Sequence, residues 1–198
     1  MRKYWLAILA SVIGLAVIGY FGYSYYEQKH RLPVYKTMPD FALENLDGSP
    51  FHFSDTDGKV RLVAFIFTNC IDVCPPTTLN MAKIQKELKA EGLFGKDVQL
   101  MTVTFDPERD TPAVLQKYAD SFGADQTGWH FLRGEEATVA QVAQSFGVGV
   151  LKQPDGTFVH TMKIFLIDKE KKMRAIYGMA AEMDMDKIIG DMKRVANE

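Results

Sequence analysis

The sequence predicts an α/β domain in which a mixed central sheet is flanked by helices, with one apolar helix ahead of it. Two largely apolar runs, residues 60–67 and 98–105, are typical of strands buried on both faces. Apolar residues at helical spacing follow each run, so strands and helices alternate along the chain. Residues 4–26 carry no charged side chain, and this stretch exceeds the roughly 20 residues that a membrane-spanning helix needs.

The apolar N-terminal stretch predicts a membrane anchor over residues 1–28 that stays attached to the chain. Trp5 lies near one end and four tyrosines crowd the other, as in an interfacial aromatic belt. A signal peptide has a shorter apolar core that ends at a small-residue cleavage site, and no cysteine follows the run to carry a lipid. Arg2 and Lys3 place the N-terminus in the cytoplasm, so we expect a single-pass protein with its domain outside, in a bacterial cell envelope.

The rest of the chain has the length of one domain, residues 38–198, which follows a predicted tether over residues 29–37. The formal net charge of −2 and a pI near 6.1 argue against a nucleic-acid partner. The chain has only two cysteines, and outside the cytoplasm a disulfide between them can persist.

The first elements of this domain follow from turn chemistry and periodicity. Residues 38–57 alternate apolar and polar side chains around Asp47-Gly48, which predicts a β-hairpin. The strand over residues 60–67 comes next. From Pro76 to Gly92 the apolar positions recur at helical spacing, and glycine favours a helix end there.

The strand over residues 98–105 leads into a second helix. Thr111 is a natural N-cap, and Pro112 suits the first helical position of a helix that ends near Phe122. The remaining predicted elements are a strand over 128–132, a helix over 135–146, a turn at Pro154-Asp155-Gly156, strands over 163–167 and 173–177 joined by a charged turn, and a closing helix over 184–196.

The two cysteines, Cys70 and Cys74, stand at the junction between the strand over 60–67 and the helix that follows. Ligands gather at such strand ends in α/β sheets. Two thiols four residues apart can close a disulfide or hold a soft metal as thiolates. On one helical turn both sulfurs face the same side, and a helix N-terminus lowers the pKa of a nearby thiol.

With these elements in place, the chain resembles the Sco/SenC family, membrane-anchored thioredoxin-fold proteins of cytochrome oxidase assembly. Three motifs carry the resemblance, in the same order over about residues 38–196. They are Cys70-Ile71-Asp72-Val73-Cys74-Pro75, then Asp106-Pro107-Glu108-Arg109-Asp110-Thr111-Pro112, and His160 just before the apolar strand over 163–167. The resemblance implies a thioredoxin-like fold, and an N-terminal anchor is a habit of the family.

The resemblance also implies that Cys70, Cys74 and His160 bind copper. Two thiolates suit Cu(I), and an imidazole lets the same site accept Cu(II). A structural zinc site would want a fourth ligand, which is not evident in the sequence. His160-Thr161 stands where thioredoxin-like oxidoreductases place a cis-proline facing their cysteines. The family often has an acidic residue just before this histidine; here it is Val159, so the partner of the imidazole differs.

The implied function is that of a copper metallochaperone, not an enzyme, which delivers copper to the binuclear centre of cytochrome c oxidase subunit II or a related oxidase. A copper donor chaperone and a thioredoxin-like reductant are further implied partners. The alternative is a thiol-disulfide oxidoreductase that keeps oxidase cysteines reduced through Cys70 and Cys74, without His160. A peroxidase would need a T-x-x-C motif, but Thr68 lies only two residues before Cys70.

Other candidates are weaker. Asp72 tunes the site or contacts a partner in one interpretation and is a solvated loop acid in the other. The remaining residues that we expect to be structural are His30, His52, His130, the methionines Met179, Met183 and Met185 (core filling rather than thioether ligands), and Asp106, Arg109 and Asp110 (ion pairing and capping in their loop).

Overall fold

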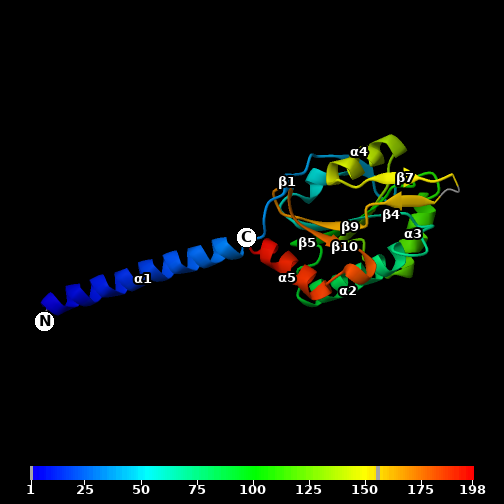
Figure 1. Ribbon diagram of the computed structural model, residues 1–198. Coiled ribbons are helices and arrows are strands. Elements are labelled where there is room, and N and C mark those ends of the chain that lie inside the picture. Colours follow the sequence, from blue (N-terminus) through cyan, green and yellow to red (C-terminus); the bar gives the residue numbers. More distant parts are fainter. Residues whose placement is uncertain (1, 155–156) are drawn as a thin grey trace. The chain divides into compact units, whose positions relative to one another are not determined.

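The computed structural model describes residues 2–154 and 157–198, which form two compact units, residues 1–33 and 34–198 (Figure 1). The predicted turn at Pro154-Asp155-Gly156 lies partly outside these residues. Within the N-terminal helix, the side chains of residues 2–3, 6–7, 23–24 and 26–30 are outside the description as well.

The first unit is helix α1, Arg2–His30, and its described side chains are exposed. Among the described residues we find no helix that is both long and apolar enough to cross a membrane. The predicted span over residues 4–26 is therefore not supported, and part of it lies outside the described side chains.

The second unit begins with short strands. β1, Lys36–Thr37, falls in the predicted tether and pairs with the far end of the chain. The predicted hairpin is confirmed as β2, Ala42–Glu44, and β3, Pro50–His52. Gly48 in its turn has a φ of +79°, a conformation that glycine adopts without strain. A 3₁₀ turn, Phe53–Thr56, follows.

The two apolar runs form the centre of the sheet, as predicted. β4, Val60–Ile66, and β5, Val98–Thr104, are parallel, and every residue of both is buried. β6, Trp129–Leu132, pairs in parallel with β5. On the other side, β9, Lys163–Ile167, runs antiparallel to β4, and β10, Lys172–Gly178, antiparallel to β9. The sheet order is β1-β10-β9-β4-β5-β6.

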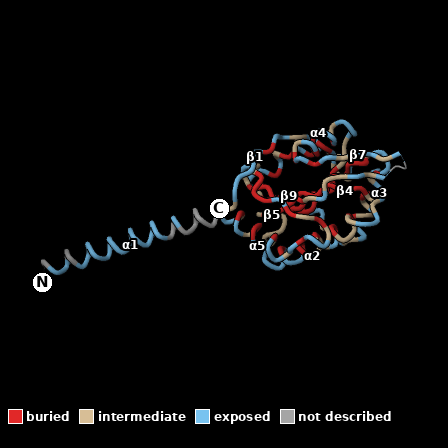
Figure 2. The backbone as a smooth tube through the Cα atoms, viewed as in Figure 1, coloured by how far each residue is buried: buried red, intermediate tan, exposed pale blue. Residues whose placement is uncertain are grey.

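Helices cover both faces of this sheet, which explains why its central strands are largely apolar (Figures 1 and 2). α2, Cys74–Ala90, and α5, Met185–Ala196, contact β5 and β4 from one face. α4, Glu136–Phe146, covers the other, where Phe146 packs on Phe65 and Phe165. α3, Pro112–Ser121, starts at the predicted cap, where the Val114 amide donates to Thr111 Oγ1.

The sequence did not predict a second hairpin, formed by β7, Val150–Lys152, and β8, Phe158–His160. It lies outside the main sheet and delivers its last residue, His160, to the start of β9. Because β9 is antiparallel to β4, the start of β9 lies at the same edge of the sheet as the ends of β4 and β5. Three chain segments that carry predicted site residues therefore meet at one edge.

Candidate functional site

The sulfur of Cys70 lies at the N-terminus of helix α2. The N-cap residue, Val73, offers no side chain to the first helical amides, and Pro75 and Pro76 have no amide proton to satisfy. Cys70 Sγ instead accepts a hydrogen bond from the Cys74 amide at 3.4 Å. The spacing of the two cysteines thus lets the sulfur of Cys70 accept a hydrogen bond from the first residue of the helix, which is Cys74.

The environment divides the two thiols into a thiolate and a thiol. The pKa of Cys70 falls to about 5, because the Cys74 thiol and the amides of residues 72–74 donate to its sulfur, which outweighs the opposing effect of burial. The pKa of Cys74 is raised, because this thiol donates to Cys70 and is buried. Cys74 is 0% exposed, whereas Cys70 is half-buried. At neutral pH the accessible sulfur is therefore the charged nucleophile and the buried sulfur carries the proton.

An aromatic cluster holds the histidine segment against this edge of the sheet. Phe158 lies 5.1 Å, between ring centroids, from both Phe67 and Phe105, which directly follow β4 and β5. His160 packs on the same two rings, 4.9 Å from Phe105 and 6.4 Å from Phe67. The backbone of Phe67 also hydrogen-bonds the Cys74 thiol. His160 and the thiol pair therefore share Phe67 as a neighbour.

The imidazole of His160 is oriented by the backbone. Its Nδ1 lies 3.0 Å from the carbonyl oxygen of Thr161, and because a carbonyl only accepts, Nδ1 carries the proton. Nε2 of the neutral ring then holds the lone pair that a metal would use. Val159 is 62% exposed and precedes His160 on a strand, so its side chain points to the other side of the hairpin. In this structure an acid at position 159 would face solvent, and the Thr161 carbonyl takes the role of imidazole partner.

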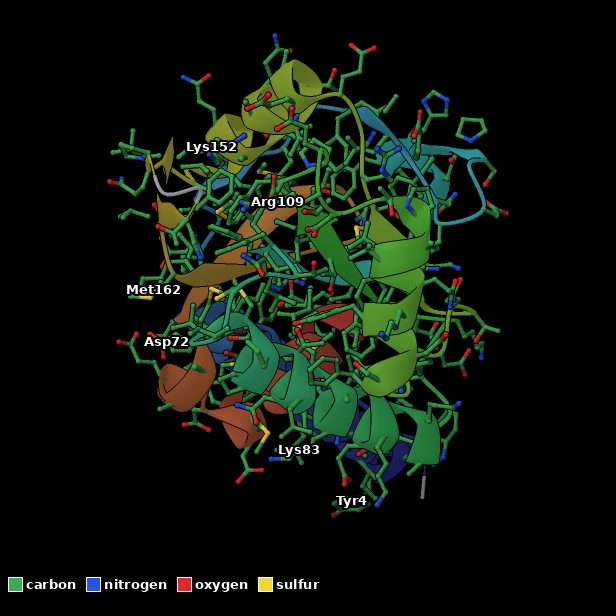
Figure 3. The ribbon with its side chains drawn as sticks, turned by 90° about the vertical axis from the view of Figure 1, so that its right-hand side faces the viewer. Tyr4, Asp72, Lys83, Arg109, Lys152 and Met162 are labelled. Atoms are coloured by element: carbon green, nitrogen blue, oxygen red, sulfur yellow. The ribbon has the colours of Figure 1, made fainter. Side chains whose placement is uncertain are left out.

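The structure brings Cys70 and Cys74 together but does not close His160 onto them. Among the described residues, no three His, Cys, Asp or Glu side chains lie close enough to hold a metal ion. Asp72 is exposed, at the same edge of the molecule as Met162, just beyond His160 (Figure 3). The site therefore consists of two adjacent thiols, one of them ionised, and an imidazole of fixed orientation at the same edge of the sheet.

The 106–112 loop contains the ion pairing that we expected, and it also packs at this edge. Arg109 pairs with Asp106, and its guanidinium lies over the Phe158 ring at 5.5 Å. Lys152 approaches the same ring at 5.9 Å, and Figure 3 shows Lys152 and Arg109 in the same region. The sequence did not indicate that Asp110 contacts the cysteine loop: it accepts hydrogen bonds from Thr68, 42 residues away.

The other candidates have structural environments. His52 is exposed, and His130 packs on Phe51 with ring centroids 5.1 Å apart. Burial and the Lys59 charge lower the pKa of His130. Met179 and Met183 are buried in the core, as predicted for packing residues, and Met185 is half-buried on α5. The side chain of His30 lies outside the described residues.

Known proteins are similar to this chain in fold and in sequence. Residues 30–197 match the SCO1/SenC family model. A SCO1 protein homolog of Bacillus subtilis is 31% identical over 84% of this chain and 86% of its own length. The structure of BsSco, described as a member of the Sco family of cytochrome c oxidase assembly proteins with a disulfide switch, has a TM-score of 0.74 and 30% identity over 84% of this chain and 98% of its own.

Several similar structures were solved with copper bound, among them the following one. Arabidopsis thaliana ScoI with copper bound has a TM-score of 0.71 and 26% identity, and the match covers 82% of this chain and all of that one. The match to the family model covers nearly all of the second compact unit, including the cysteine loop and the hairpin that carries His160. The chain therefore belongs to the SCO1/SenC family.

Proposed function

We propose that this protein binds copper through Cys70, Cys74 and His160 and delivers it during assembly of cytochrome c oxidase, at the binuclear copper centre of subunit II. The observation that carries the proposal is the thiol pair: an accessible thiolate at Cys70 beside the buried thiol of Cys74, with the Nε2 lone pair of His160 at the same edge. The relative solved with copper bound supports copper as the metal. The relative described as a cytochrome c oxidase assembly protein supports a role in that assembly.

The donor set suits transfer of copper. Copper binding would displace the Cys74 proton, and the hairpin β7–β8 would bring His160 toward the two sulfurs. Two soft thiolates hold Cu(I), and the imidazole extends the site to Cu(II). Three ligands leave a coordination position open, so a thiolate of the receiving subunit can add before a ligand of this chain leaves. A copper donor chaperone and a thioredoxin-like reductant are the partners that such a cycle needs.

The first experiment is a Cu(II) titration of the reduced full-length chain, followed by absorption and electron paramagnetic resonance spectroscopy. We expect stoichiometric binding, a thiolate-to-copper charge-transfer band and nitrogen hyperfine structure, because sulfur and imidazole would both ligate the metal. The Cys70→Ser variant is the control and should lose the band. Rapid oxidation to a Cys70–Cys74 disulfide that retains no copper would reject the copper proposal.

A second candidate function is thiol-disulfide exchange with the oxidase cysteines. The low pKa of Cys70 favours it, because the accessible thiolate is the species that attacks a disulfide. This role needs neither His160 nor a metal. The two functions are compatible in one protein. The reduced pair can bind copper or attack a disulfide, and the oxidised pair can do neither.

We also propose that residues 34–198 work on the outer side of the cytoplasmic membrane, because the positive residues Arg2 and Lys3 precede the apolar stretch. Cys70 is the reactive thiol, so a membrane-impermeant maleimide added to intact cells after an impermeant phosphine reductant should label the protein. Cys70→Ser should remove the label, because Cys74 is fully buried. Labelling that appears only after permeabilisation would place the domain inside.

A further inference from the structure

We infer that Asp110 is a positioning residue for the thiol pair: its buried carboxylate holds the start of the cysteine loop, and thereby keeps Cys70 Sγ at the N-terminus of helix α2. The inference rests on the thiol pair of the proposed function but not on copper. It gives the motif over residues 106–112 a role in the thiol chemistry of the motif over residues 70–75.

The contacts of Asp110 converge on two strand ends. Its side chain is 0% exposed. Its two oxygens accept from the backbone amide of Thr68 at 3.1 and 3.3 Å, and one also accepts from the Thr68 hydroxyl. The other accepts from the hydroxyl of Thr104, the last residue of β5. Its own amide donates to the carbonyl of Asp106 at 2.9 Å. Asp110 therefore joins the exit of β4, the exit of β5 and the entrance to α3.

The charge of Asp110 makes these bonds strong. Among the described residues, no cation pairs with its carboxylate. A buried carboxylate without a counter-ion depends on its hydrogen-bond donors, and such charge-assisted bonds are about twice as strong as neutral ones. Within the described part of the chain, the donors to its carboxylate all belong to two threonines, Thr68 and Thr104. Because a carboxylate only accepts, the Thr68 amide and hydroxyl are both fixed in direction.

The anchored residue lies at the start of the loop that shapes the thiol site. Thr68 is two residues before Cys70, whose amide donates to the Phe67 carbonyl at 3.2 Å in a tight turn. The turn aims Cys70 Sγ back at the Cys74 amide, 3.4 Å away. If Thr68 is released, the start of the loop loses its tie to the Asp110 side chain, and the side-chain ties that remain among the described residues reach the other end of the loop, at Val73 and Cys74. Cys70 would then lose donors that stabilise its thiolate.

A purely structural role for Asp110 predicts a different outcome. In that case its bonds would only fasten the 106–112 loop to β5, and their loss would lower thermal stability without changing the thiol. Thr104 separates the two roles, because its hydroxyl bonds Asp110 and the Asp106 amide and has no hydrogen bond to the described residues of the cysteine loop. Thr104→Val is therefore the matched control for Asp110→Asn.

The test is the pH dependence of Cys70 alkylation by iodoacetamide in the reduced, copper-free full chain, with the melting temperature measured in parallel. For Asp110→Asn we expect the alkylation midpoint to rise by about one pH unit, a roughly tenfold smaller thiolate-to-thiol ratio. Thr104→Val should lower the melting temperature and leave the midpoint unchanged. Thr68→Val, which keeps the amide donor, should shift the midpoint in the same direction by less.

An unchanged midpoint in folded Asp110→Asn would overturn the inference, as would an equal shift in Thr104→Val. If Asp110→Asn does not fold, Thr68→Val decides, and an unchanged midpoint there overturns it too. The copper titration of the wild-type chain is independent of these results. Failure of copper binding with a shifted alkylation midpoint would reject the proposed function and keep the role of Asp110.

Discussion

The His160→Ala variant is expected to bind copper at least about a hundredfold more weakly than the wild-type chain. Losing only a hydrogen-bond partner of a metal-bound histidine costs 10–100-fold in affinity in metalloproteins, so losing the ligand itself should reach at least the upper end of that range. The remaining two sulfurs still suit Cu(I) but lack the imidazole that accommodates Cu(II). The loss should therefore be larger for Cu(II).

The same variant should keep its thiol chemistry. The causes that lower the pKa of Cys70 all lie in the segment from residue 72 to 74, and His160 is not among them. We therefore expect disulfide formation at the wild-type rate. This combination, copper affinity lost and thiol reactivity retained, distinguishes a metal ligand from a residue that merely supports the fold.

The measurement is a competition titration with a chromophoric copper chelator, run beside a disulfide-formation assay. His52→Ala is the matched control, because His52 is exposed and lies on the separate β2–β3 hairpin. It should bind copper as the wild type does. Equal copper affinity in His160→Ala and wild type would remove His160 from the site.

Sequence patterns predicted the parts of the fold that local chemistry determines. The runs that form β4 and β5 are largely apolar because both faces of the central sheet are covered, and that signal is strong in one sequence. Helix α3 starts where Thr111 and Pro112 place it. The sequence also placed the two cysteines at a strand end, because their position depends only on the local order of strand and helix.

The parts that sequence could not predict depend on distant contacts. The hairpin β7–β8 is short and none of its strand residues is fully buried, so it has no periodic signature. It is held by Phe158 on Phe67 and Phe105, rings about 50 to 90 residues earlier in the chain. His160 entered the site only through family resemblance. Asp110 was noticed in a motif, but its partner Thr68 is 42 residues away.

The last expectation concerns which sulfur attacks. Cys70 should react with iodoacetamide with a midpoint near its pKa of about 5 and at full rate by pH 7, because its thiolate form is then complete. Cys74 should not react in the folded chain, because it is buried and its raised pKa keeps it protonated. Peptide mapping after alkylation at pH 7 should place the label on Cys70 alone. Equal labelling of both cysteines would contradict the asymmetry.

The asymmetry also fixes the order of disulfide exchange. The Cys70 thiolate attacks a partner disulfide and releases one partner thiolate; Cys74 then gives up its proton, attacks the sulfur of Cys70 and releases the second. Cys74→Ala should therefore accumulate a mixed disulfide through Cys70, whereas Cys70→Ala should form none. In Cys74→Ala the alkylation midpoint should also rise, because the thiol that donates to Cys70 is gone.

Since the closed disulfide offers no thiolate, the oxidised wild-type chain should bind no copper until a reductant reopens the pair. Copper bound by the oxidised chain would separate the two functions and place the metal elsewhere.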